Sequence, residues 1–179
     1  FRYEDATDIF APEIKRLGMV TSALFTDVDS DHHPDLLVTY EWGPVRYFHN
    51  EEGKLIDRTS QSGLADRQGW YNSISGGDMD NDGDTDYLVG NFGLNTKYQA
   101  STTNPEIMYY GDFEGNGKKR IIEAKYENGI CFPQRGLGCS SGAMPMVKQK
   151  LPTYHQFAIT SLQGIYTEDL LNDAEKFEV

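Results

Sequence analysis

Two short stretches of this chain place carboxylates at alternate positions. They read DVDSDHHPD at 27–35 and DMDNDGDTD at 78–86, and both follow the pattern D-x-D-x-D-x-x-x-D. Four carboxylates within nine residues repel one another when the loop closes, because like charges at short range raise its free energy. A compact loop with this sequence is therefore expected to hold a cation.

Calcium suits such loops best, because it prefers oxygen ligands and accepts an irregular shell of six to eight of them. Positions 1, 3, 5 and 9 would supply side-chain oxygens, and position 7 a main-chain carbonyl. The predicted metal ligands are Asp27, Asp29, Asp31, His33 and Asp35 in the first loop and Asp78, Asp80, Asp82, Asp84 and Asp86 in the second. An EF-hand is disfavoured, because Val38 and Val89 occupy position 12, where that motif has a glutamate.

The two loops differ at position 6, where a left-handed backbone is expected. Gly83 adopts that conformation easily, whereas His32 in the first loop does so at a cost of about 1 kcal/mol. We therefore expect the first loop to bind calcium more weakly than the second.

A third turn, DFEGNGKKR at 112–120, has a degenerate form of the pattern. Asp112, Glu114 and Asn116 keep oxygen atoms at positions 1, 3 and 5, but Arg120 replaces the last aspartate. One interpretation is a degenerate site in which Arg120 pairs with Asp112 or Glu114 in place of the ion. The alternative is that this turn joins the third and fourth strands of the preceding repeat.

These turns recur within a longer repeat. Residues 22–40, 73–91 and 107–125 align without gaps, and an Asp-x-Thr marker at Asp5 and Asp57 precedes the first two turns at nearly equal distances. In the first repeat, turn residues separate four predicted strands near 19–26, 35–41, 44–50 and 54–59. Four antiparallel strands in a repeat of about 40–50 residues are typical of a β-propeller blade.

The predicted fold is all-β, with about three four-stranded blades that form part of a longer ring of about six to eight. The expected segments are an outer strand and linker at 1–17, blades at 18–66 and 67–105, and a last blade at 106–179. A helical apolar pattern, with a capping box at Thr153 and Gln156, predicts a small helical insertion near 141–173. Packing on the blades is the expected role of this insertion, and a partner-binding helical pair is the alternative.

The chain resembles the FG-GAP or VCBS repeat family, which includes the calcium-loop blades of integrin α-subunits. The stretch GWYNSISGGDMDNDGDTDYLVGNFGLNTKY is similar to secreted VCBS proteins akin to cartilage acidic protein and the ASPIC/UnbV group. MPMVKQKLPTYHQFAITSLQGIY is similar to a helical insertion of that branch. The resemblance implies a secreted or cell-envelope propeller that binds calcium and serves as a scaffold for protein or carbohydrate ligands at the cell surface, with further blades in the same longer chain.

Composition excludes other classes of partner. The 179 residues include 28 acidic and 16 basic side chains, which gives a formal net charge of −12. Such a charge repels phosphate backbones and anionic lipids, so nucleic-acid binding is not expected. The mean hydropathy of −0.58 and the lack of a long apolar run argue against membrane insertion.

Evidence for an enzyme is weak at the sequence level. Gly138-Cys139-Ser140-Ser141-Gly142 satisfies G-x-S-x-G, but Pro133 and Gly136 disrupt the strand that this motif requires before it. We therefore expect no catalytic residues, and the alternative is the propeller part of a secreted polysaccharide-active enzyme. Cys131 and Cys139 could form a disulfide across the intervening turn or remain free thiols, and the sequence leaves both open.

Overall fold

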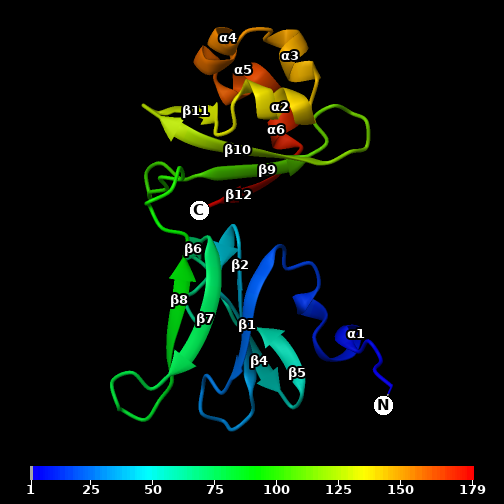
Figure 1. The fold of residues 1–179 in the computed structure, drawn as a ribbon. Helices are drawn as coiled ribbons and strands as arrows, with labels where there is room; N and C mark the ends of the chain where they lie inside the picture. The colour runs from blue at the N-terminus through cyan, green and yellow to red at the C-terminus, as the bar shows by residue number, and fades with distance from the viewer. Residues whose placement is uncertain (1) are drawn as a thin grey trace. The chain divides into compact units, whose positions relative to one another are not determined.

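The computed structural model describes residues 2–179 and shows two compact units, Phe1–Gly93 and Leu94–Val179 (Figure 1). Each unit has its own antiparallel sheet and its own hydrophobic core.

The first unit is built around a four-stranded antiparallel sheet whose strands follow one another in chain order. These strands are β1 (Val20–Thr26), β2 (Asp35–Tyr40), β4 (Arg46–Glu51) and β5 (Lys54–Asp57). All four lie close to the positions predicted from turn residues and apolar runs. The short β3 (Gly43–Pro44) leaves this sheet and pairs with β6 (Gln68–Gly69).

One face of this sheet is covered by the segment that precedes it. The buried cluster consists of Leu36, Val38, Tyr40 and Phe48. Ile14 and Leu17 of the preceding segment pack against it, together with Leu55 of β5. This covering segment contains a single helical turn, α1 (Thr7–Phe10), and the 3-10 turn η1 (Pro12–Ile14). The N-terminal segment thus shields apolar side chains of β2 and β4 from water.

A two-stranded hairpin completes the first unit. It consists of β7 (Tyr71–Gly77) and β8 (Asp86–Asn91), and β7 lies against β1 (Figure 1). The second expected blade therefore has two strands here rather than four. The chain after Asn91 reads FGLNTKYQASTTNP, in which turn-forming residues interrupt any strand-like alternation.

The second unit combines a sheet with a helical layer. Its strand order is β11-β10-β9-β12, with bounds β9 (Ile107–Gly111), β10 (Arg120–Glu127), β11 (Ile130–Pro133) and β12 (Glu175–Glu178). Five short helices cover one face of the sheet (Figure 1): α2 (Leu137–Ala143), α3 (Met146–Lys150), α4 (Tyr154–Ile159), α5 (Leu162–Tyr166) and α6 (Glu168–Asn172).

The helical layer lies where the helical insertion near 141–173 was predicted. Its first helix begins at Leu137, earlier than the expected insertion, and Val147, Phe157, Leu162 and Ile165 join Ile107 and Ile122 of the sheet in one buried cluster. The capping box of Thr153 and Gln156 is confirmed at the start of α4. The helices therefore pack their apolar side on the sheet, as expected, and form part of the core of the second unit.

Candidate metal-binding loops

Each acidic turn connects two antiparallel neighbouring strands in the same register. The first loop joins β1 to β2, the second joins β7 to β8, and the third joins β9 to β10. In each case the residue before position 1 pairs with position 9, as in Thr26 with Asp35, Gly77 with Asp86, and Gly111 with Arg120. The third turn lies within a sheet of the second unit, so it does not close the β7–β8 sheet as the alternative interpretation required.

The carboxylate at position 1 organises each loop through main-chain hydrogen bonds. Asp27 accepts the N–H of Asp31 at 3.1 Å and that of His32 at 2.9 Å. Asp78 accepts the corresponding N–H groups at 3.2 Å and 3.2 Å, and Asp112 accepts them at 3.2 Å and 2.6 Å. The three loops thus share one backbone conformation, even though their side chains differ.

Two positions in each loop have a left-handed backbone. Position 6 has φ of 68° at His32 and 99° at Gly83, as the sequence predicted, and 77° at Gly117 in the third loop. Position 4 also has positive φ, at Ser30, Asn81 and Gly115, which the sequence analysis did not anticipate. Asparagine and glycine tolerate this region better than most residues, which in retrospect is a weak local signal.

Position 9 separates the first two loops from the third. Asp35 accepts the N–H of Val28 at 3.1 Å, and Asp86 accepts the N–H of Met79 at 2.9 Å. The Nε of Arg120 instead donates to the carbonyl of Ala143 at 3.2 Å, at the end of α2. In the part of the chain that the structure describes, no ion pair joins Arg120 to Asp112 or Glu114, so the expected pairing is wrong; the guanidinium contacts the helical layer instead.

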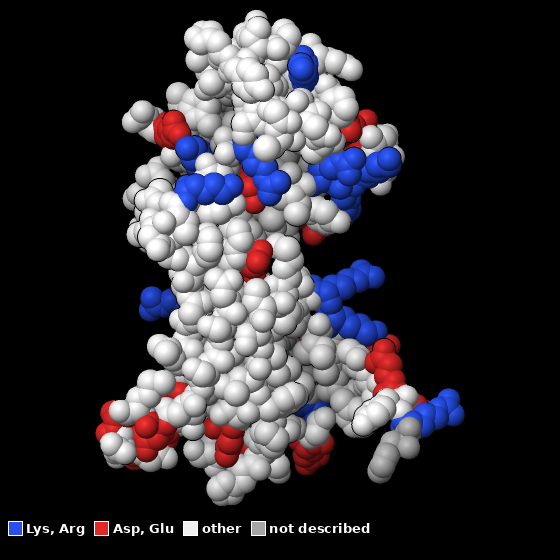
Figure 2. Space-filling view, viewed as in Figure 1, with Lys and Arg blue, Asp and Glu red and all other residues white. Residues whose placement is uncertain are grey.

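Carboxylates of the first two loops converge as a metal site requires. The candidate ligand atoms lie within 4.8 Å of one another in the sets Asp27, Asp29 and Asp31, and Asp78, Asp80 and Asp86. Figure 2 shows acidic side chains exposed at the loop end of the first unit. Oxygen donors of this kind fit calcium, which tolerates the irregular geometry of a tight loop.

The remaining predicted ligands take part in the loops through other contacts. Asp82 accepts the N–H of Asp84 at 3.1 Å, and Asp31 accepts the N–H of His33 at 2.8 Å. These main-chain hydrogen bonds lower the pKa of the Asp82 and Asp31 carboxyls. The pKa of Asp84 is raised by its side-chain hydrogen bond to Asp82. In the second loop, the neighbouring carboxyls of Asp82 and Asp84 therefore have pKa shifts of opposite sign.

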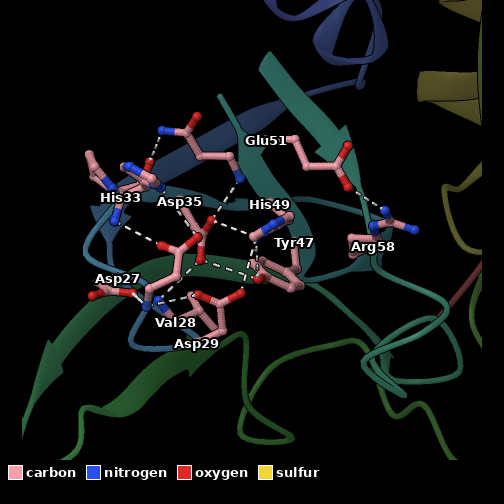
Figure 3. Close-up of polar contacts among 12 residues, drawn as sticks. Asp27, Val28, Asp29, His33, Asp35, Tyr47, His49, Glu51 and Arg58 are labelled. Atoms are coloured by element: carbon pink, nitrogen blue, oxygen red, sulfur yellow. Dashed lines mark hydrogen bonds and ion pairs between the residues drawn. The ribbon is translucent and has the colours of Figure 1, made fainter. Parts of the chain in front are cut away.

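His49 is a site residue that the sequence analysis missed. Its Nδ1 lies 3.1 Å from Oδ1 of Asp35 and 3.2 Å from Oδ2 of Asp29 (Figure 3). His49 belongs to β4, two positions after Tyr47, so both side chains project from the same face of that strand. Its place beside the loop follows from the pairing of β2 with β4, and no local motif in the sequence marks it.

Asp35 is fully buried at the centre of this arrangement. It accepts the N–H of Asn50 at 2.7 Å and the hydroxyl of Tyr47 at 3.1 Å. Burial, followed by the charge of Asp35, raises the pKa of the Tyr47 hydroxyl, so that hydroxyl stays a hydrogen-bond donor. An open hollow of about 550 Å³ lies beside the cluster and is lined by Asp31, His33 and His49, among other residues.

The other sequence candidates lie in the second unit. Ser140 of the G-x-S-x-G stretch is buried on α2, and its hydroxyl donates to the carbonyl of Arg135 at 3.3 Å. Both cysteines are free thiols: Cys131 is buried, which raises its pKa to about 11, and Cys139 is exposed. Of the two alternatives for the cysteines, the structure contains the free thiols.

Comparison with known protein families finds a match within the first unit. Residues 27–89 match an FG-GAP-like repeat, a region that contains the first two loops and the strands between them. No curated protein and no solved structure matches the chain. Among the described residues, none of the helices is both long and apolar enough to cross a membrane.

Proposed function

We propose that this chain is a calcium-stabilised β-propeller module that serves as a binding scaffold for protein or carbohydrate ligands outside the cell or in the cell envelope. The observation that carries the proposal is the repeated loop. Two copies share register, main-chain hydrogen bonds and convergent carboxylates, and both lie within the region that matches an FG-GAP-like repeat.

The exposure of the loops supports a role in a calcium-rich environment. Asp29 and Asp80 are exposed, so these ligands remain partly hydrated and their affinity for calcium is expected to be modest. Extracellular calcium modules work with dissociation constants of about 10⁻⁴–10⁻³ M, which calcium outside the cell satisfies. A bound ion would remove the repulsion among the carboxylates and fix the two hairpins.

The sheet order supports the propeller assignment. The strands β1, β2, β4 and β5 form an antiparallel meander in chain order, and β7 of the next hairpin lies against β1. A propeller blade has the same meander, and the first strands of successive blades lie next to one another. Further blades of a longer chain would supply the strands that the β7–β8 hairpin lacks.

Binding rather than catalysis is the activity that we propose. The hydroxyl of Ser140 is buried and donates to a main-chain carbonyl, so it is poorly placed as a nucleophile. The acidic loops, in contrast, present an exposed surface whose negative charge is reduced when a cation binds.

Calorimetric titration of calcium into untagged, chelator-treated protein tests this proposal. We expect two calcium sites in the wild type, one in Asp78→Asn, and two in the control Asp66→Asn, an exposed carboxylate outside the loops. A glycan array and a cell-surface binding assay, each with and without chelator, then test the ligand class. The absence of calcium binding in the wild type would contradict the proposal.

A further inference from the structure

The first loop contains a second group of donors that the second loop lacks. Asp29, Asp35 and His49 each offer one ligand atom, and these atoms lie within 4.8 Å of one another. Asp29 comes from the loop, Asp35 begins β2, and His49 is in the middle of β4. We propose that these three residues form a site for a transition cation of the zinc class, which shares Asp29 and Asp35 with the first loop and differs from it by the imidazole of His49.

The spacing of the donor atoms suits such an ion. Ligand atoms about 2.0–2.1 Å from a tetrahedral zinc ion lie roughly 3.3 Å from one another. Nδ1 of His49 is 3.1 Å from the Asp35 oxygen and 3.2 Å from the Asp29 oxygen. A cation can therefore enter among these atoms with small shifts of the side chains.

Charge balance also favours a divalent ion. Asp35 is fully buried, and among the described residues no lysine or arginine forms an ion pair with it; its ion-pair partner is His49. His49 faces a second carboxylate, that of Asp29. A divalent ion with a neutral imidazole would balance both carboxylates, whereas a buried carboxylate without a full counter-charge is costly.

The donor set distinguishes this site from the calcium loops. Imidazole nitrogen is a preferred ligand of zinc and related transition metals, whereas calcium takes oxygen atoms. The second loop has Asp80 and Asp86 at the positions of Asp29 and Asp35, but its candidate metal cluster contains carboxylates alone. The same chain therefore provides an oxygen-only loop for comparison.

Surrounding groups hold the donors in place. The hydroxyl of Tyr47 donates to the Asp35 carboxylate (Figure 3). The N–H of Asn50 donates to the same carboxylate, and the two hydrogen bonds orient it. Hydrogen bonds of this kind to ligating groups are a common support of metal sites. The hollow of about 550 Å³ that His49 lines provides the entry path and leaves room for a fourth, non-protein ligand.

The test uses cobalt(II) as a visible probe on untagged, chelator-treated protein, with zinc as the competitor. We expect the wild type to bind cobalt with the visible absorption bands of nitrogen ligation, and zinc to displace it. His49→Gln removes the imidazole and should weaken zinc binding by about 100-fold or more, since loss of even a supporting group costs about 10–100-fold. His155→Gln is the matched control, because His155 is an exposed histidine of α4 in the second unit.

Several outcomes would overturn the proposal. These are equal zinc affinities in the wild type and His49→Gln, or an equal loss in His155→Gln. Asp29→Asn, at an exposed loop position, removes a ligand without disturbing the buried Asp35 and should also abolish zinc binding.

Parallel calcium titrations separate this inference from the proposed function. Asp80→Asn in the second loop should lower calcium binding and leave zinc binding unchanged. Zinc binding without calcium binding would support this site and contradict the calcium proposal. Calcium binding without zinc binding would support the calcium proposal and contradict this site.

Discussion

Exchange of the residues at position 6 tests how much backbone strain in the first loop lowers the free energy of unfolding. His32 has φ of 68° and its side chain is 94% exposed, so its ring contributes little packing. A left-handed backbone costs a non-glycine residue about 1–2 kcal/mol, a cost that glycine avoids. Glycine also raises the conformational entropy of the unfolded chain, which reduces this gain by about 0.4–1 kcal/mol. The substitution His32→Gly should therefore raise the free energy of unfolding by about 0.5–1 kcal/mol.

The reverse substitution should have the opposite sign. A β-carbon at Gly83 would meet nothing within 4 Å, so Gly83→His is sterically free and its effect arises from the backbone alone. Because φ of 99° lies far from the left-handed minimum near 57°, the loss should be at least as large as the gain at His32.

Thermal unfolding in excess calcium is the appropriate assay, because calcium keeps both loops closed. A gain of 0.5–1 kcal/mol corresponds to a rise in melting temperature of about 2–8 °C for a cooperative unit of 60–100 residues. His33→Gly is the control: His33 has no positive φ and should lose stability on conversion to glycine. Equal shifts in His32→Gly and His33→Gly, or an unchanged melting temperature in Gly83→His, would refute the reasoning.

Three further predictions follow from the loops and from one buried carboxylate. Chelation should lower the melting temperature, since calcium at about one hundred times its dissociation constant adds about 2.7 kcal/mol, and an unchanged melting curve would contradict the metal assignment. Arg120→Asp should add a calcium site in the third loop by calorimetry, whereas Arg120→Ala, which removes the charge without adding a ligand, should not. Burial of Glu123 would raise the pKa of its carboxyl, but the hydrogen bonds and charge of Arg135, together with the Tyr98 hydroxyl and the charge of Lys97, outweigh burial and lower it. Its stabilisation should therefore be complete above about pH 4.5 and fall as pH drops toward the lowered pKa, and Glu123→Gln should flatten this slope in chemical unfolding.

The loops and the first four-stranded sheet were predictable because their signals are local. Alternating carboxylates, a glycine at position 6 and apolar runs on either side specify a strand–turn–strand unit within about 20 residues of sequence. The shared register of Thr26 with Asp35 and of Gly77 with Asp86 shows that the repeat fixes pairing as well as the turn. The capping box at Thr153 is equally local and was also found.

Features that depend on pairing between distant segments were not predictable. β12 joins β9 through pairs such as Glu175 with Tyr110, although its sequence, EKFE, carries little strand signal. Arg120 was expected to act within its own loop, yet its partner is Ala143, 23 residues later in the chain. Such contacts arise from the helical layer that folds over the sheet, and no spacing rule in a single sequence encodes them.

The first loop combines a feature that is predictable from local sequence with one that depends on pairing between distant strands. Its carboxylates follow from nine consecutive residues, so their convergence could be anticipated. The nitrogen donor comes from β4 because Leu36 of β2 pairs with Phe48, which places His49 beside Asp35. A loop motif thus predicts that a cation binds, but the neighbouring strand determines which cation binds best. Two loops with the same motif are therefore expected to differ in metal preference as soon as one of them acquires an imidazole from outside the motif.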